Sequence, residues 1–266
     1  MAKLFLVGTP IGNLKDITYR AVETLKEVDV IACEDTRHSM ILLNAYDIKK
    51  PLLSIHKFNE KSQIEKVSML LKEGKSVAYI SDAGMPSISD PGFILLNEIK
   101  KNFDVEIIPG VTAFATAMVG SGLDSTKFTF LGFLPEKQKD KKVLLERYKN
   151  LDSTLIFYVS SHNLEKDLKV LYENLGERRV VVANELTKKF EKYIEGNLKD
   201  IQITEPRGEY VVLVEGQNLN SPLNELSIDE HFSYYINEGL SKNEAIKKVA
   251  SDRGLKKDEV YKHFIK

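Results

Sequence analysis

Short apolar runs alternate with helix-like patterns through the first part of the chain. Runs rich in aliphatic and β-branched residues predict strands at 3–8, 30–33, 52–55, 77–80 and 105–108. Between these runs, apolar residues recur every three or four positions and predict helices at 17–27, 36–45, 63–72, 93–101 and 112–120. Strands that alternate with helices are typical of a parallel sheet with helices on both faces.

The alternation restarts after the turn-like segment 121–125. Further strands are predicted at 128–133, 154–159, 179–184, 190–195 and 210–214. The interval between the third and fourth of these is too short for a crossover helix, which favours some antiparallel pairing. From Pro222 onward the pattern is only helical.

These patterns predict an α/β protein and already divide the chain into domains. We expect an N-terminal parallel-sheet domain at 1–121, a second α/β domain with a mixed sheet at 122–218, and a helical C-terminal extension at 219–266. A length of 266 residues is enough for about two domains with real cores.

Composition narrows the class of protein. The net charge of −1 excludes a chain that is basic throughout. A single cysteine, Cys33, excludes an intramolecular disulfide and fits a reducing compartment. No apolar run is long enough for a signal peptide or a membrane span, so we expect a soluble, cytoplasmic protein without a membrane partner. The five histidines and Cys33 show no ligand-like spacing, and no metal site is predicted.

The stretch SDAGMPSISDPG at 81–92 joins a predicted strand to a predicted helix. About two to six residues are enough for such a connection, and extra length often belongs to a binding loop. Asp90 followed by Pro91 predicts the start of the helix, with Asp90 as N-cap. Gly84 and Gly92 permit backbone conformations that a side chain would forbid. An ordinary rigid surface loop is the alternative interpretation.

Glycine-bearing loops follow three of the predicted strands. They are 8–13 (GTPIGN), the 81–92 loop, and 109–113 (PGVTA). Ligands of open α/β sheets bind outside the carboxyl ends of the strands, so these loops predict a small-ligand site. The first loop lacks the third glycine of a dinucleotide fingerprint, and no Gly-Lys-Ser/Thr phosphate loop occurs.

The motifs, taken in order, resemble a known family. They are LFLVGTPIGNLKDIT, VIACEDTRHS, SDAGMPSISDPG, PGVTAFATAM, LIFYVSSH, ANELTK and GEYVVLVEG, and the tail GLSKNEAIKKVASDRGLKKDEVYKHF is also similar. Together they resemble the ribosomal RNA small subunit methyltransferase I family, the 16S rRNA cytidine 2′-O-methyltransferases of the tetrapyrrole methylase superfamily. Tetrapyrrole-modifying relatives usually carry a GxGxGD-like first loop and a shorter GDP-type loop. The departure from both favours the RNA branch.

The resemblance implies a homodimer of two-domain α/β subunits that binds S-adenosylmethionine in the cleft between the domains. It also implies methylation of a cytidine 2′-hydroxyl in the decoding centre of 16S rRNA within the small ribosomal subunit. The residues expected to contact S-adenosylmethionine are Pro10, Asp82, Ala83, Gly84, Ile88, Thr112, Ala113, Tyr158, Asn184, Glu185 and Leu186. For each of them loop packing is the alternative, and Asp82 could instead cap its own loop in an Asx-turn.

Methyl transfer from a sulfonium is an in-line displacement, which alignment and a positioned base both assist. Glu34 or Asp35 is the candidate to orient or deprotonate the hydroxyl, and Arg37 to hold an RNA phosphate. The alternative is that Asp35 or Thr36 is only a helix N-cap. His162 is a second catalytic candidate and His56 a weaker one.

RNA binding requires positive surface, and lysines and arginines gather in two places. One cluster is Lys137, Lys139, Lys141, Lys142, Arg147 and Lys149. The other is Lys242, Lys247, Lys248, Arg253, Lys256, Lys257, Lys262 and Lys266. Acidic residues are interspersed in both, so solvated helix faces are the alternative.

Other functions stay open at this point. A methyltransferase of the same fold could act on a tetrapyrrole or, like diphthine synthase, on a protein residue, although the basic clusters speak mildly against it. The tail also resembles a helix-turn-helix with Gly254 at its turn, which raises a ligand-sensing DNA-binding regulator without catalysis.

Overall fold

The computed structural model describes residues 2–56, 59–204, 207–217 and 222–264. Within this described part the chain divides into two compact units. The first is Met1–Ser121 with Val182–Tyr193 and Gly208–Val211, and the second is Gly122–Val181 with Ile194–Arg207 and Val212–Lys266. The finer division at 121/122 and 218/219 stays a prediction.

The first unit contains a parallel sheet with the strand order β3-β2-β4-β1-β5. The strands are β1 (Leu4–Val7), β2 (Val30–Cys33), β3 (Leu52–Ser54), β4 (Val77–Ile80) and β5 (Val105–Ile108). Between them run α1 (Tyr19–Glu27), α2 (Thr36–Ala45), α3 (Glu60–Lys72) and α4 (Phe93–Ile99), with α5 (Ala113–Gly120) after β5 and a short 3-10 helix at Leu14–Asp16. The predicted parallel α/β arrangement is confirmed, and element ends differ from the prediction by up to three residues.

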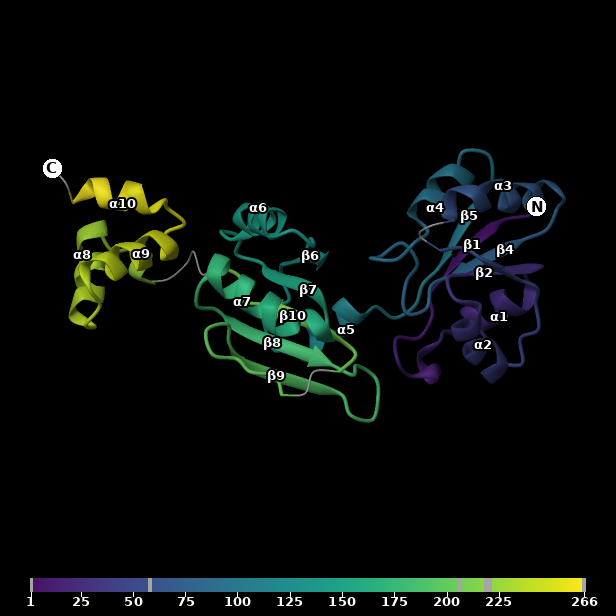
Figure 1. Ribbon diagram of the computed structural model, residues 1–266, viewed down its shortest axis with the longest axis horizontal. Coiled ribbons are helices and arrows are strands. Elements are labelled where there is room, and N and C mark those ends of the chain that lie inside the picture. Colours follow the sequence, from purple (N-terminus) through teal and green to yellow (C-terminus); the bar gives the residue numbers. More distant parts are fainter. Residues whose placement is uncertain (1, 57–58, 205–206, 218–221, 265–266) are drawn as a thin grey trace. The chain divides into compact units, whose positions relative to one another are not determined.

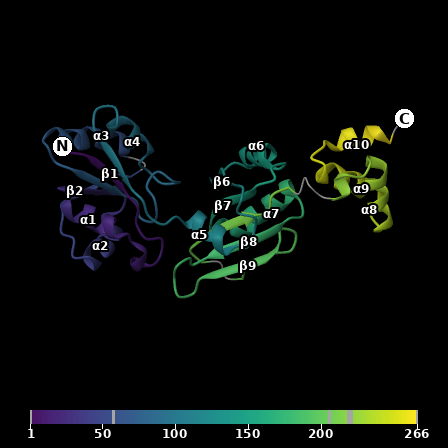
Figure 2. The ribbon, with the colours of Figure 1, turned by 180° about the vertical axis from the view of Figure 1, so that it is seen from behind.

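The sheet is covered on both faces, which explains why its strands are apolar throughout. Leu4, Leu6 and Tyr79 pack in one core with residues of α3 and α4. Val7 and Ile80 point the other way, into a core shared with α1 and α2. Figures 1 and 2 show α3 and α4 on one side of the sheet and α1 and α2 on the other.

This alternation creates a crevice at the carboxyl edge. The chain leaves β4 towards α4 on one face, whereas it leaves the neighbouring strands β1 and β2 towards α1 and α2 on the other. Connections that diverge to opposite faces open a gap above the strand ends, which is where ligands bind in such sheets.

The second sheet has the order β6-β7-β10-β8-β9. Its elements are β6 (Phe128–Phe133), α6 (Gln138–Tyr148), β7 (Thr154–Ser160), α7 (Leu164–Leu175), β8 (Arg179–Asn184), β9 (Lys192–Asn197) and β10 (Glu209–Val214), with a 3-10 turn at Ser161–Asn163. β6 and β7 are parallel, whereas Leu198 donates back to Arg178 at 2.9 Å across the β8–β9 pair. The predicted mixed sheet is confirmed. β9 begins two residues later than predicted because Lys188 and Glu191 take part in turns.

The C-terminal helices α8 (Ile228–Asn237), α9 (Lys242–Asp252) and α10 (Lys257–His263) follow a 3-10 turn at Pro222–Asn224. Ile246, Val249 and Val260 form their core, with Phe232 and Phe264 packed against it. Ser227 and Ser241 begin α8 and α9 with capping boxes. Gly254 has φ +64° at the turn between α9 and α10, a conformation that glycine adopts without strain. No helix within the described residues is long and apolar enough to cross a membrane.

Candidate functional site

The three glycine loops meet at the carboxyl edge of the first sheet. Thr9 and Gly84 exchange backbone hydrogen bonds of 2.9 and 3.2 Å, which pairs the first loop with the 81–92 loop. A Cβ on Gly8 would lie 2.7 Å from the backbone nitrogen of Gly110, so only glycine allows the first loop to approach the loop after β5 this closely. The loops thus form one continuous structure.

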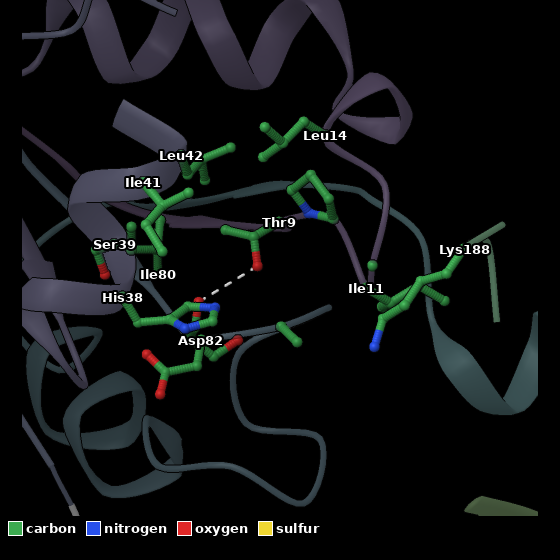
Figure 3. Close-up of a pocket in the computed structure, with 14 residues that line it drawn as sticks. Thr9, Ile11, Leu14, His38, Ser39, Ile41, Leu42, Ile80, Asp82 and Lys188 are labelled. Atoms are coloured by element: carbon green, nitrogen blue, oxygen red, sulfur yellow. Dashed lines mark hydrogen bonds between the residues drawn. The ribbon is translucent and has the colours of Figure 1, made fainter. Parts of the chain in front are cut away.

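A cavity of about 340 Å³ lies beside this junction. Its walls come from the loop after β1, the start of α2, the end of β4 and Lys188 of the 182–193 segment. The lining residues are Thr9, Pro10, Ile11, Gly12, Leu14, His38, Ser39, Ile41, Leu42, Ile80, Ser81, Asp82, Ala83 and Lys188. In Figure 3, Leu14 and Leu42 lie on one side of Thr9, and His38 and Asp82 on the other. An apolar wall opposite a few polar groups is typical of a small-molecule site.

The 81–92 loop is held in an unusual backbone conformation. Ser87 and Ser89 have φ of +71° and +66°, which non-glycine residues rarely adopt. Gly92, at φ +121°, packs so closely on the ring of Tyr79 that a Cβ would come within 2.7 Å of it. Such strain persists only where surrounding contacts impose it, and it is concentrated at functional sites.

The predicted helix start at Asp90 and Pro91 is wrong. α4 begins at Phe93, with Gly92 as its N-cap residue. Its first N–H groups are satisfied from another element: Oε1 of Glu60 accepts from the N–H of Gly92 at 3.1 Å and from that of Leu95 at 2.8 Å. The residues 81–92 are therefore a loop through to their end.

Asp35 and Arg37 form a closed pair at the start of α2. Oδ1 of Asp35 accepts from the backbone N–H of Arg37 at 2.8 Å, and Oδ2 accepts from Nη2 at 2.8 Å. These hydrogen bonds lower the pKa of Asp35 to about 2. The N-cap alternative for Asp35 is confirmed. Arg37 remains 90% exposed, so its outer face is open to a ligand.

Several carboxylates lie close enough at this edge of the sheet to influence one another. Burial and the neighbouring charges of Glu34, Glu209 and Asp82 raise the pKa of Asp90 to about 7. Burial and Asp82 also raise the pKa of Glu34. Oδ1 of Asp82 accepts from the backbone N–H of Asp35 at 3.3 Å, so this contact joins the ends of β4 and β2 rather than closing an Asx-turn in its own loop. The negative charge at this edge matches a cationic ligand better than an anionic one.

Only some of the residues predicted to contact the cofactor line the cavity. Pro10, Asp82 and Ala83 line the cavity, and Gly84 pairs with Thr9 beside it. The remaining ones do not line it: Ile88, Thr112, Ala113, Tyr158, Asn184, Glu185 and Leu186.

These residues have identifiable local roles. Thr112 is the N-cap residue of α5, and the Asn184 side chain donates to the carbonyl of Glu209 at 3.0 Å. Glu185 accepts from Lys188 at 2.9 Å, and the carbonyl of Leu186 approaches Gly12. Tyr158 packs edge-on against Phe130 and Phe133 of β6.

Among the catalytic candidates, Glu34, Asp35 and Arg37 stand next to the cavity in sequence without lining it. His162 belongs to the second unit, where its Nε2 lies 3.2 Å from Oγ of Ser160. His38, Leu14, Ile41, Leu42 and Lys188 line the cavity but were not among the predicted site residues. His38 stood inside the VIACEDTRHS motif, so its helical spacing from Asp35 was the signal that could have found it. Within the described residues no cluster of histidine, cysteine and carboxylate side chains could hold a metal ion.

Two members of the basic clusters are not available to RNA. Lys141 is 4% exposed and forms a buried ion pair with Asp167 of α7. Arg253 donates from Nε to Nδ1 of His231 at 3.0 Å and from Nη2 to backbone carbonyls that include that of Ser227. Both side chains hold helices together. Lys266 lies outside the described residues.

Comparison with known proteins gives relatives over nearly the whole chain. The family model for Tetrapyrrole (Corrin/Porphyrin) Methylases matches residues 3–202. Ribosomal RNA small subunit methyltransferase I of Bacillus subtilis is 43% identical over 98% of this chain and 93% of its own length. The protein of the same name from Mycoplasmopsis pulmonis is 51% identical over 80% of this chain and 97% of its own length.

Solved structures show the same fold at lower identity. The methyltransferase CobJ superimposes with a TM-score of 0.65 at 18% identity, covering 82% of this chain and 95% of its own. Diphthine synthase gives 0.62 at 18% identity, covering 82% and 91%. A uroporphyrin-III C-methyltransferase from Thermus thermophilus, complexed with S-adenosylhomocysteine, gives 0.58 at 17% identity, covering 80% and 97%.

Proposed function

Because the chain belongs to the tetrapyrrole methylase family and, within it, to the ribosomal RNA small subunit methyltransferase I family, we propose that it methylates rRNA of the small ribosomal subunit with S-adenosylmethionine. The acceptor is the 2′-hydroxyl of a cytidine in the decoding centre of 16S rRNA. The observation that carries the proposal is the junction of the three glycine loops beside the cavity, in a chain with full-length relatives that bear this name.

The residues at the junction fit S-adenosylmethionine. The glycines at Gly8, Gly84 and Gly110 carry no side chain, so a compact ligand can approach the backbone of these loops closely. One oxygen of Asp82 accepts from Asp35, which leaves the other for a ribose hydroxyl or the methionine ammonium group. The carboxylates at this edge also favour a sulfonium cation.

The residues proposed to hold the cofactor are those predicted from the sequence, with Pro10, Asp82, Ala83 and Gly84 at the junction. S-adenosylmethionine would supply an electrophilic methyl group. The contribution of the chain is to fix the geometry, since alignment of the acceptor oxygen with the methyl carbon accounts for much of the rate of such a transfer. The exposed guanidinium of Arg37 would hold a phosphate of the RNA next to the cavity.

RNA would also contact the basic surface of α6. Lys137, Lys139, Lys142 and Arg147 are exposed there, whereas Lys141 is not. The exposed lysines of the C-terminal helices, Lys247 and Lys257 among them, would add to this surface. Each phosphate contact would make binding depend on salt.

The proposal also covers the oligomeric state of the protein and its place in the cell. We infer a cytoplasmic homodimer from the resemblance, with RNA surface shared between subunits. Sedimentation at micromolar concentration tests the assembly, and a monomer would count against it. Tetrapyrrole and diphthine methylation have less support. The solved structures of a cobalt precorrin-4 methyltransferase and of diphthine synthase are 22% and 18% identical to the chain, and at that identity they indicate the fold alone.

The decisive experiment compares 16S rRNA from a strain that lacks this protein with rRNA from its parent. Mass spectrometry of nuclease fragments should show one cytidine that loses a 2′-O-methyl group in the deletion strain and regains it on complementation. An unchanged methylation pattern would eliminate rRNA methylation. Calorimetry with S-adenosylmethionine should give one site per chain.

A further inference from the structure

His38 presents its imidazole to the cavity from the first turns of α2. It is exposed, and within the described part of the chain no residue is hydrogen-bonded to the ring. Histidine is the side chain most often used as a general base. No role described so far uses it.

The carboxylates predicted as bases are worse placed. Both oxygens of Asp35 already accept from Arg37, and the low pKa of about 2 makes Asp35 a weak base. Glu34 does not line the cavity, and its half-buried carboxylate lies next to that of Asp82. His38 therefore replaces them as the group with both a free nitrogen and access to the cavity.

The cavity has the size and lining for a nucleoside. A volume of about 340 Å³ falls in the lower range of small-ligand sites. Leu14, Ile41 and Leu42 offer an apolar surface for the face of a base, as pockets for unstacked bases do. The polar lining residues His38 and Lys188 can contact the sugar and its phosphates.

We propose that the α2 side of this cavity, formed by His38, Ile41 and Leu42, receives the target nucleoside beside the residues proposed to hold the cofactor, and that His38 is the general base for the 2′-hydroxyl. The inference rests on the proposed function and adds the acceptor site and the base to it. The O–H bond of the hydroxyl breaks and its proton passes to the free imidazole nitrogen. The oxygen uses that electron pair to bond the methyl carbon, while the sulfur retains the pair of the bond that breaks.

Two charged residues line the cavity together with His38. They are Asp82, from the loop after β4, and Lys188, from the 182–193 segment. On its own helix the Asp35–Arg37 pair is closed and nearly neutral overall. Only the neutral imidazole accepts a proton, so the rate should rise with pH as the ring loses its own.

The first test is His38→Asn, which keeps a polar side chain but removes the base. Single-turnover methylation of small subunits at saturating enzyme should fall by about 10²- to 10⁴-fold. The rise of the rate with pH should disappear, while the affinity for small subunits stays within about twofold. His263→Asn, at another exposed histidine on α10, should leave rate and pH profile unchanged.

The second test fills the cavity and does not depend on turnover. Ile41→Trp adds bulk at a side chain that is 62% exposed, so the fold should tolerate it. Binding of a short RNA with the target cytidine, measured with S-adenosylhomocysteine present, should weaken at least tenfold. Binding of S-adenosylmethionine alone should not change. Met69→Trp on α3, at 60% exposure, is the matched control and should bind both normally.

Each contrary result overturns the inference. If His38→Asn kept the wild-type rate and pH profile, His38 would not be the general base. If the variant lost RNA affinity but kept the saturated rate, His38 would be a phosphate contact instead. Loss of S-adenosylmethionine binding in Ile41→Trp would assign the cavity to the cofactor. Wild-type protein that binds S-adenosylmethionine but never methylates small subunits would remove the proposed function and the role of His38 with it.

Discussion

Oε1 of Glu60, at the start of α3, accepts from the backbone N–H of Leu95 at the start of α4, at 2.8 Å. The same oxygen accepts from Gly92, and the Glu60 side chain is almost fully buried. A carboxylate that lies 35 residues away in sequence thus provides the N-terminal cap that α4 lacks in its own sequence. It also fixes the end of the 81–92 loop.

Glu60→Ala should therefore destabilise the protein. Loss of this acceptor leaves buried N–H groups without partners, at a cost of about 1–3 kcal/mol in the free energy of unfolding. Chemical denaturation measures the change. Glu65→Ala, at an exposed position of the same helix, is the control and should change stability by less than about 0.5 kcal/mol. Equal effects of the two changes would show that the contact with Leu95 contributes nothing.

Asp90 makes stability depend on pH in an unusual direction. Its pKa of about 7 in the folded protein lies above the ordinary value of an unfolded aspartate. The folded state therefore holds a proton that the unfolded state has lost, and stability should fall as pH rises from about 4 through about 7.

Asp90→Asn removes this titration. Allowing for partial exposure to solvent, we expect the variant to gain about 1–2 kcal/mol over the wild type between pH 4 and pH 8. Urea denaturation at several pH values gives the two curves. If the free energies of unfolding of the two proteins changed with pH in parallel, the pKa of Asp90 would not be raised in the folded protein.

Gly84 is required for backbone geometry before any ligand is considered. Its φ of +80° would strain Gly84→Ala by roughly 1–2 kcal/mol, although the new Cβ would lie no closer than 3.4 Å to Ile11. Gly84→Val would add β-branching and confuse strain with loss of binding. The alanine variant should remain folded and, if the loop backbone holds the cofactor, bind S-adenosylmethionine more weakly in calorimetry. Unchanged affinity for S-adenosylmethionine would show that the cofactor does not bind against the backbone at Gly84.

The basic surface of α6 can be tested without disturbing the fold. Converting Lys137, Lys139 and Lys142 to Gln should weaken binding to small subunits and reduce its dependence on salt, with up to about 0.7–0.9 lost from the log–log slope per phosphate contact. Affinity for S-adenosylmethionine should stay the same. Lys141 must be left intact, because loss of its buried pair with Asp167 would destabilise α6 and α7.

The control is the same triple change on α3, at the exposed Lys61, Lys66 and Lys72. It alters net charge equally but lies outside both basic clusters. If the two triple variants had the same salt slope, only the total charge would matter and α6 would have no specific role.

Local sequence patterns were enough to predict most of the strands and helices, one helix cap and the family. Apolar runs and helical spacing predicted β2, α2 and β4 at their observed bounds, because these segments are buried on one or both faces wherever they lie in the fold. The Asp35 cap could be anticipated since an N-cap bonds to the residues directly after it. Motif order gave the family, and loops at the carboxyl ends of strands gave the edge at which to look for a site.

Only the tertiary structure decided which side chains act together. The sequence predicted Asp90 as the N-cap of α4, but Glu60 from α3 accepts the hydrogen bonds from Gly92 and Leu95. A buried N–H can pair with any acceptor that the packing places beside it, including one from a distant segment. The sequence does not distinguish Lys141 from its exposed neighbours, but in the folded protein Lys141 forms a buried ion pair with Asp167 of α7. The cavity joins Leu14, His38, Asp82 and Lys188 from four separate segments. Sequence spacing carries no information about such meetings, since they depend on how distant segments fold against one another.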